Sequence, residues 1–577
     1  MSEFVASLST MSPAFVVLAA GILAMLIPSV VVRKVLMIAA PLIAGAIMLT
    51  TPSIGSFGAF EVAGFTLETY RYDELSRVWG LIFVLIAFLN AIYSVHERSQ
   101  MSDAAALLYS GAAIGAVFAG DLLTLFFFWE LTALASVFLI FAAGGSVAYR
   151  AGLRYLAIQV LSGVLLLGGA AVWAQTQGWA FNEIGLDSVA GRIILIGFGI
   201  KAGFPLVHMW INDAYPKASA TGAVVLSAFT TKLAIYVLAR AYAGEDILIV
   251  IGAVMAVFPA IFILFEDDMR RCAAYALNST LGFMVVGVGI GTEKAIAAVA
   301  ANAFVGVIYI ALMFMVLGAV MAQTGTARAS QLGGLYRRMP LTALFGVISA
   351  LALAAAPAFS GFVAKALTLS AVLGEHRGDI WLALVFGSAG VLAHAALKIP
   401  YLVFFGPDRG PDHASTVREA PPGMLIAMAM ASALCLYLGL DYELLYSLLP
   451  GDVAYAPYTL GHILGQAQLL FMVAFAFALA LALKLYPARQ PISVRDADWL
   501  YRGFGDGAVR WGTVMTIKLI EHIQRGLGGA FSRFGRRLFH LFSPGGALAR
   551  TVPSGLMAIW TTVILALILI VAYFSPA

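Results

Sequence analysis

The chain has 577 residues, of which 62% are hydrophobic and 11% charged, and its mean hydropathy is +0.95. This composition excludes an ordinary water-soluble domain and a disordered chain. It indicates a polytopic helical membrane protein whose main solvent is the lipid bilayer. The formal net charge of +4 gives no reason to expect a nucleic-acid partner.

The start of the chain and its cysteines narrow the class further. The opening MSEFVASLST lacks the basic segment of a cleavable signal peptide, so none is expected. Cys272 and Cys435 lie in or beside apolar segments, and they supply no disulfide framework, CxxC metal site or iron–sulfur cluster. We therefore expect no metal and no other cofactor, and a chain that carries no electrons and is not by itself an enzyme.

A membrane-spanning helix needs about 20 apolar residues, and this length criterion predicts sixteen helices. The second is expected to be short and the twelfth to be interrupted at Pro357. Residues 51–74 contain Gly, Pro and alternating apolar positions, which predicts a short β-hairpin outside the membrane. The helices are expected near residues 14–32, 35–50, 75–95, 104–120, 121–143, 151–175, 191–211, 219–242, 246–265, 272–291, 294–322, 340–374, 379–406, 422–440, 459–485 and 555–574.

Loop charge predicts the orientation of these helices. Loops after even-numbered helices are acidic, as in the stretches 61–74 and 441–452. Loops after odd-numbered helices are basic, so the positive-inside rule places them in the cytoplasm and the N-terminus outside. The basic residues are Arg33 and Lys34; His96 and Arg98; Arg150 and Arg154; Lys217; Arg270 and Arg271; Arg328, Arg337 and Arg338; Arg409 and Arg418.

The stretch from Gly191 to Arg240 carries the first chemical signal. Two apolar segments each hold one lysine near the middle, Lys201 and Lys232. A lysine at that depth costs roughly 2.5–3.5 kcal/mol, so it normally faces a partner or a wet cavity. Pro205 follows Lys201 by four residues and frees backbone groups that are tolerable only inside protein or beside water. The alternative is that each lysine extends its amine to the membrane surface.

The twelfth predicted helix repeats this pattern. Pro357 and Lys365 stand in PAFSGFVAK, so an apolar helix again carries a proline break and one lysine. The seventh and twelfth helices are five apart, an odd number, so units built on them have opposite orientations in the membrane. Paired interrupted segments of this kind indicate the transport site of an inverted-repeat transporter.

Glu130 is a carboxylate in the middle of LTLFFFWELTALASVFLIF, and Lys201 is its natural partner. A close opposite charge favours the charged forms of both groups, whereas desolvation opposes them. This balance suits a lysine that takes up and releases protons, although a static ion pair also fits it.

Residues 486–553 differ from the rest of the chain in composition, because they are rich in Arg and Gly. Within them, residues 509–525 alternate apolar and charged positions at helical spacing, which predicts an amphipathic helix on the cytoplasmic surface against lipid or another subunit. The alternative is a flexible basic linker. The last span then re-enters the membrane.

Four blocks resemble one known family. FFFWELTALASVFLI, GIKAGFPLVHMWINDAYPKASA with TTKLAIYVLAR, FEDDMRRCAAYALNSTLGFM and PAFSGFVAKALTL look like the antiporter-like subunits of complex I and of Mrp cation/proton antiporters, above all the D-type Mrp component. The resemblance covers roughly residues 75–440. The last two helices and the surface stretch between them are similar to the C-terminal extension of the longest complex I antiporter-like subunit.

The resemblance implies an all-α fold with about fourteen core transmembrane helices. Helices 4–8 and 9–13 form inverted five-helix repeats, helices 7 and 12 are broken, and two further helices form the extension. By motif, Glu130, Lys201, Lys232 and Lys365 occupy the positions of the family's mid-membrane proton path. His208 and Asp213 are supporting residues beside the first break. The corresponding divisions of the chain are 1–103, 104–242, 246–406, 407–485 and 486–577.

One segment departs from the family pattern. The eleventh helix usually carries titratable groups on one face, where this chain has Asn302, Gly306 and Ile310, and the tenth carries Asn278. Either water held by Asn278, Asn302 and nearby tyrosines bridges Lys232 and Lys365, or the path is broken. His394 and Lys398 on the thirteenth helix are candidates to compensate, although Lys398 lies near a helix end.

These observations predict a proton-translocating subunit of a multi-subunit Mrp-type Na⁺(K⁺)/H⁺ antiporter in a bacterial cytoplasmic membrane. Its expected partners are other membrane subunits, the lipid bilayer, H⁺ and either Na⁺ or K⁺. The alternatives are a pump module of a redox-driven NADH:quinone oxidoreductase-like or hydrogenase-like complex, and a scaffold that conducts no ions. The sequence leaves open which cation is exchanged and with what stoichiometry.

Overall fold

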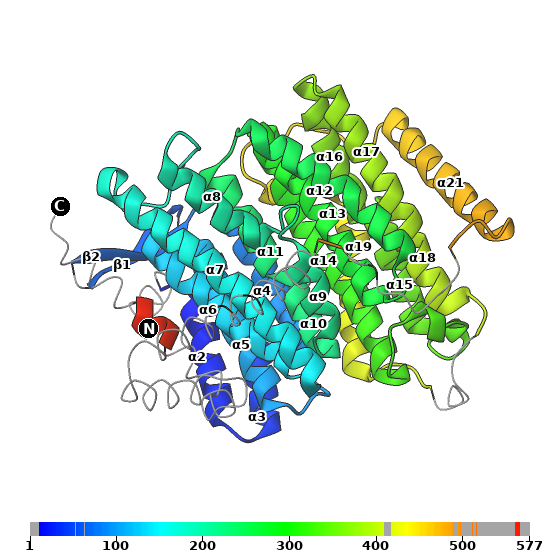
Figure 1. Ribbon diagram of the computed structural model, residues 1–577, viewed down its shortest axis with the longest axis horizontal. Helices are drawn as coiled ribbons and strands as arrows, with labels where there is room; N and C mark the ends of the chain where they lie inside the picture. The colour runs from blue at the N-terminus through cyan, green and yellow to red at the C-terminus, as the bar shows by residue number, and fades with distance from the viewer. Residues whose placement is uncertain are drawn as a thin grey trace. The chain divides into compact units, whose positions relative to one another are not determined.

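The computed structural model describes residues 11–51, 53–62, 64–408, 417–487, 494, 496–497, 511, 515 and 560–565. The chain forms two units, Met1–Asp496 and Ala497–Ala577, and every helix labelled below belongs to the first (Figure 1). The predicted surface helix at 509–525 lies outside the described residues apart from Trp511 and Met515. Of the last predicted span, residues 560–565 are described, and they are helical.

The N-terminal part of the first unit is a group of long apolar helices with one hairpin. Strands β1 (Gly55–Val62) and β2 (Phe65–Tyr72) pair antiparallel, with Val62 opposite Phe65, so the predicted hairpin is confirmed. The helices are α2 (Pro13–Leu26), α3 (Val30–Thr50), α4 (Glu74–Tyr93), α5 (Gln100–Phe118), α6 (Leu122–Phe141) and α7 (Gly145–Gln177).

The middle and C-terminal parts contain the broken helices. Between α7 and α14 the chain forms α8 (Val189–Ala202), α9 (Met209–Ala214), η1 (Tyr215–Lys217), α10 (Ala220–Ala228), α11 (Thr230–Ala241), α12 (Asp246–Phe265) and α13 (Met269–Ile290). It continues with α14 (Glu293–Thr324), η2 (Ala329–Gln331), η3 (Leu335–Arg337), α15 (Pro340–Leu353), α16 (Ser360–Gly374) and α17 (Gly378–Val391). The last elements are η4 (Leu392–Leu397), α18 (Lys398–Pro400), η5 (Tyr401–Phe405), α19 (Pro422–Leu440), α20 (Tyr442–Leu448) and α21 (Leu460–Ala482).

The predicted membrane spans are present throughout the described part of the chain. Twelve helices there are long and apolar enough to cross a membrane, counting α10 with α11 and α17 through η5 as single spans. The other three predicted spans appear as α2 and as two broken pairs, α8 with α9 and α15 with α16. The interruptions predicted at Pro205 and Pro357 are therefore confirmed, whereas the two-fold relation between the repeats and the finer domain limits stay predictions.

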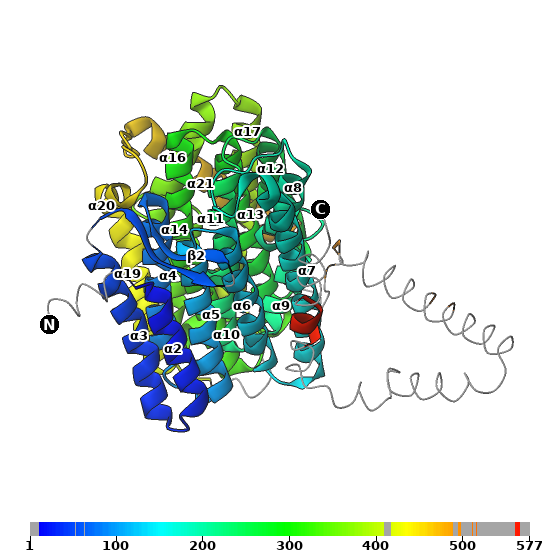
Figure 2. The same ribbon diagram turned by 90° about the vertical axis from the view of Figure 1, so that its left-hand side faces the viewer.

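The core of the unit lies around α13 and α14, which are almost completely buried. Helix α14 contacts α4, α10, α13, α15, α16 and α19, and Figure 2 shows it inside the bundle. Small residues bring α12 and α13 together: a Cβ on Gly252 would lie 2.5 Å from the Val286 amide, and one on Gly282 would lie 2.4 Å from the Ala256 amide. Lipid supplies no hydrophobic driving force for helices to associate, so close backbone packing of this kind holds the helices together instead.

The first two spans differ from their prediction. The first ends at Leu26 rather than at residue 32, because Pro28 follows it and proline cannot continue a helix. The second is a full span that begins at Val30, so it is not short. Arg33 and Lys34 thus lie within a helix rather than in a loop.

Asp103 of α5 pairs with both of these cations. Its carboxylate lies 3.0 Å from Arg33 Nε and 2.5 Å from Lys34 Nζ, and the aspartate is 1% exposed. Arg33 also donates to the carbonyls of Pro28 and Arg98, and Lys34 donates to that of Ser94. The cluster therefore joins the ends of α2, α3, α4 and α5.

The Asp103→Asn substitution should destabilise the protein by about 3–5 kcal/mol, because it leaves two buried cations without their counter-charge. The Asp246→Asn substitution is the matched control, since Asp246 pairs with Arg377 at an exposed site and such pairs contribute at most about 1 kcal/mol. Thermal melting of the purified protein in detergent measures both. Equal melting temperatures for the two variants would show that the Asp103 cluster contributes little.

Candidate functional site

The first broken helix places Lys201 at a helix end inside the bundle. Helix α8 stops at Ala202 because Gly203 adopts a left-handed conformation, with φ of 77°. Pro205 follows, and α9 begins only at Met209. Lys201 occupies the last turn of α8 and is completely buried, so it does not extend its amine to a membrane surface.

The Lys201 amine is held by α6. Its Nζ donates to the Trp129 carbonyl at 2.6 Å and to Thr132 Oγ1 at 2.9 Å, and it lies 4.1 Å from the centre of the Trp129 indole. The negative face of an indole attracts a cation, most strongly where water is absent. These contacts accommodate an ammonium group without a counter-ion in direct contact.

Glu130 follows Trp129, but its carboxylate makes no direct ion pair with Lys201 among the described contacts. Glu130 Oε1 is buried without a described hydrogen-bond partner. It lies against Gly163 of α7, where an added Cβ would be 1.5 Å from the oxygen. The expected approach of Glu130 to Lys201, by a direct ion pair or through water, therefore stays a prediction.

Lys232 lies beside a break that the sequence did not reveal. The predicted span 219–242 is confirmed as the single span Ala220–Ala241. Its helix is interrupted at Phe229, which separates α10 from α11. Carbonyls at the end of a helix lack intrahelical partners, and Lys232 Nζ donates to one of them, that of Ser227, at 2.7 Å. No proline or glycine stands at the break, so the usual sequence signals are missing.

Lys365 repeats this arrangement at the second predicted break. Helix α15 ends at Leu353, and Lys365 Nζ donates to the Leu353 carbonyl at 2.8 Å and to Ser388 Oγ at 3.3 Å. Ala355 and Ala358 take positive φ values of 55° and 74° in the connection. Lys365 stands after its break and Lys201 before its own, so the two lysines approach the breaks from opposite directions along the chain.

A cavity of about 600 Å³ lies beside Lys365. It is bounded by α16, α17 and α21, and its polar lining includes Lys365, Ser388, His462 and Gln466. Gln466 Nε2 also donates to the Ala354 carbonyl at 3.0 Å, so α21 covers backbone that the break has exposed. The sequence assigned no role to His462 or Gln466 because α21 lies outside the family-like segment.

Buried polar atoms without described partners occur on the helices that connect these lysines and on the neighbouring α6 and α9. Helix α8 contacts α11, α11 contacts α13, and α13 contacts α16. The side-chain amides of Asn212 and Asn278, Thr231 Oγ1 and Glu130 Oε1 are all buried without a described hydrogen bond. Because buried polar groups are almost always hydrogen-bonded, such atoms indicate positions for water.

Asn302 and the glycine near it have different surroundings from Asn278. The Asn302 amide donates to the Ala364 carbonyl at 3.0 Å and to Thr368 Oγ1 at 2.6 Å, which ties α14 to α16. An added Cβ on Gly306 would lie 3.5 Å from the Tyr309 hydroxyl. A tyrosine therefore stands where the family pattern leads one to expect a titratable side chain, and Ile310 beside it is buried.

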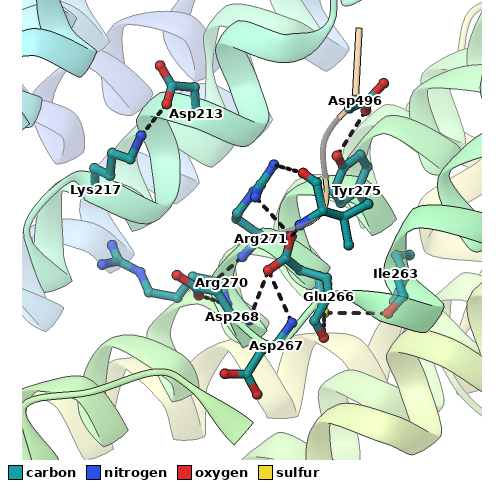
Figure 3. Close-up of polar contacts among 12 residues, drawn as sticks. Asp213, Lys217, Ile263, Glu266, Asp267, Asp268, Arg270, Arg271, Tyr275 and Asp496 are labelled. Atoms are coloured by element: carbon teal, nitrogen blue, oxygen red, sulfur yellow. Dashed lines mark hydrogen bonds and ion pairs between the residues drawn. The ribbon is translucent and has the colours of Figure 1, made fainter. Parts of the chain in front are cut away.

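Three other supporting residues have structural partners. Asp213 accepts from Arg154 Nε at 2.8 Å and pairs with Lys217 (Figure 3). Lys398 donates to the carbonyls of Ile263, Leu264 and Glu266, so it caps the end of α12 rather than extending to the membrane surface. His394 Nδ1 lies 3.1 Å from the Tyr486 hydroxyl.

His208 has a partner that the sequence did not suggest. Its Nε2 lies 3.0 Å from Asp496 Oδ2, and the Tyr275 hydroxyl donates to the same oxygen at 2.9 Å. Asp496 is separated from His208 by 288 residues, so no local pattern could have revealed the contact. Among the described residues no cluster of three or more His, Cys, Asp or Glu could hold a metal ion.

Residues 119–392, which include all four candidate residues, match the family described as NADH:quinone oxidoreductase/Mrp antiporter, TM. This central segment is similar to the members of that family. A Na(+)/H(+) antiporter subunit of Bacillus subtilis is 26% identical over 400 residues, which cover 64% of this chain and 80% of the relative. The resemblance expected from the sequence motifs is therefore confirmed.

Two solved structures share the fold. A chain of the Mrp complex from Dietzia sp. has a TM-score of 0.70 at 23% identity, covering 82% of this chain and 99% of that chain. A chain of the membrane-bound sulfane sulfur reductase, an archaeal respiratory membrane complex, has a TM-score of 0.71 at 20% identity, covering 97% and 99%. The protein is thus a multi-pass membrane protein whose relatives are subunits of multi-subunit membrane assemblies.

Proposed function

We propose that this chain is the proton-translocating, antiporter-like subunit of a multi-subunit Mrp-type Na⁺(K⁺)/H⁺ antiporter. Protons move along Glu130, Lys201, Lys232 and Lys365. The observation that carries the proposal is the placement of three completely or almost completely buried lysines at interrupted helices inside the bundle. The Bacillus subtilis relative, named as part of a Na(+)/H(+) antiporter, supports the same interpretation.

The chemistry follows from what surrounds each amine. An ammonium group deep in a membrane protein is expensive, and here it is stabilised by carbonyls, hydroxyls and aromatic faces instead of a fixed counter-ion. Loss of the proton removes the charge and leaves the amine able to accept a hydrogen bond from water. Each lysine can therefore alternate between two forms that the same pocket accommodates.

Glu130 is the group that biases this alternation. Its carboxylate lies against Gly163 with one oxygen free of described partners. Motion of the carboxylate toward Lys201 would favour the ammonium form, and motion away would favour the neutral amine. Water at Asn212, Thr231 and Asn278 would relay protons toward Lys365.

A second candidate function is a pump module of a redox-driven complex. The sulfane sulfur reductase chain covers 97% of this protein, against 82% for the Mrp chain, and this larger coverage favours the second candidate. Iron and acid-labile sulfide in the purified complex would identify the redox assembly, and their absence would identify the antiporter.

For either function, we propose that the chain lies in a bacterial cytoplasmic membrane with its N-terminus outside.

The Gly163→Ala substitution should lower proton flux by up to about a hundredfold, because a displacement of about 1 Å at a reacting group can cost that much. The added methyl group would overlap the position of Glu130 Oε1. Gly168→Ala is the matched control on the same helix, since a Cβ there meets nothing within 4 Å. Proton flux into vesicles containing the assembled complex is the measurement. Equal flux in both variants would mean that the position of Glu130 does not matter.

The Lys201→Ala and Lys365→Ala substitutions should each lower proton flux by about a hundredfold or more, as expected when a positioned proton carrier is removed. The exposed Lys294→Ala is the control. Assembly is checked by co-purification of the other subunits. Wild-type flux in both variants would identify the chain as a scaffold, with the proton path in another subunit.

A further inference from the structure

Asp496 follows α21 in the sequence, and its carboxylate lies beside the first broken helix. Asp496 is 7% exposed. Its Oδ2 atom lies 3.0 Å from His208 Nε2 in the α8–α9 break and accepts from the Tyr275 hydroxyl of α13 at 2.9 Å. Figure 3 shows Asp496 beside Tyr275, one helical turn from Arg271.

The backbone around Asp496 is anchored separately from its side chain. The Val494 amide donates to Glu266 Oε2 at 3.4 Å, and Arg271 Nη2 donates to the Val494 carbonyl at the same distance. Arg271 Nη1 and Glu266 Oε2 form an ion pair at 2.9 Å. These contacts hold the Val494 backbone without involving the Asp496 carboxylate.

Asp496 contacts the same helix, α13, that carries Asn278, one of the residues at which water is expected to bridge Lys232 and Lys365. Tyr275 and Asn278 lie three residues apart on α13, and both amide atoms of Asn278 are buried without described partners. The space beside Gly203 brings Asn278 and His208 together, because a Cβ there would lie 3.5 Å from Asn278 Oδ1 and 3.7 Å from His208 Cβ. The second ring nitrogen of His208, Nδ1, is also buried without a described partner.

We propose that Asp496 and His208 form a proton-exchange pair that feeds the lysine path from the α12–α13 side of the bundle. This inference rests on the proposed function. Protonated Asp496 transfers its proton to His208 Nε2, so that the O–H bond breaks and an N–H bond forms. The imidazolium then releases the Nδ1 proton toward Asn278 and water. Tyr275 orients the carboxylate, and the charged groups facing the pair are Arg271 and Glu266.

The test compares three variants of the assembled complex in vesicles. Asp496→Asn keeps the shape and the hydrogen bond from Tyr275 but cannot exchange a proton, so flux should fall at least about tenfold. Asp496→Glu restores an ionisable group and should recover most of the flux. Asp452→Asn, at an exposed aspartate, is the matched control and should have no effect.

A purely structural carboxylate would give a different pattern. If Asp496 only holds the segment, Asp496→Asn will retain wild-type flux at every pH, and the proposal is then overturned. If Asp496→Asn fails to assemble, infrared spectroscopy of Asp496→Glu replaces it. The carboxyl band that titrates in the wild-type complex must then shift in Asp496→Glu, and an unshifted band overturns the proposal. Lys201→Ala is measured in parallel. If Lys201→Ala loses flux while Asp496→Asn stays fully active, the Asp496–His208 pair is rejected and the proposed function stands. If Lys201→Ala keeps wild-type flux, the proposed function itself is rejected.

Discussion

The hydrogen bond between a buried lysine and a carbonyl that a helix break has released is the interaction on which this site depends. Either group alone is costly in a membrane, because the amine loses its hydration and the carbonyl loses its intrahelical donor. Lys365 with Leu353 and Lys232 with Ser227 satisfy each other at 2.8 and 2.7 Å. The break therefore makes the lysine tolerable, and the lysine makes the break tolerable.

The rest of the bundle supports these pairs by close packing and by covering them. Glycines let α12 and α13 approach closely, and Gln466 of α21 bonds to the Ala354 carbonyl in the second break. Lys398 uses the same chemistry, since it donates to three carbonyls at the end of α12. Lys365 differs from Lys398 in two respects. Its amine also donates a hydrogen bond to a hydroxyl, that of Ser388, and a cavity of about 600 Å³ lies beside it.

Much of the fold could be predicted because bilayer thickness fixes span length and proline fixes breaks. The spans and the interruptions at Pro205 and Pro357 followed from those rules, and the hairpin followed from its alternating apolar positions. The break at Phe229 could not, because it carries neither proline nor glycine and depends on tertiary contacts such as the hydrogen bond that the Thr230 amide donates to the Tyr109 hydroxyl. Arg33 and Lys34 were assigned to a loop because their partner, Asp103, is far away in the sequence.

The candidate lysines and Glu130 could likewise be found from charge in apolar segments, but their partners could not. Side-chain direction decides whether Glu130 meets Lys201 or Gly163, and no residue pattern contains that information. The Asp496 contact escaped prediction because it joins segments 288 residues apart.

The central claim is that water connects the buried polar atoms of Glu130, Asn212, Thr231 and Asn278 to the lysines. Electron cryo-microscopy of the assembled complex in lipid nanodiscs, at a resolution that shows ordered water, tests it most directly. The account predicts water density within hydrogen-bond distance of Glu130 Oε1 and of both Asn278 amide atoms, continuing toward Lys365. The absence of water density between Lys232 and Lys365, with these polar atoms hydrogen-bonded to one another, would contradict it.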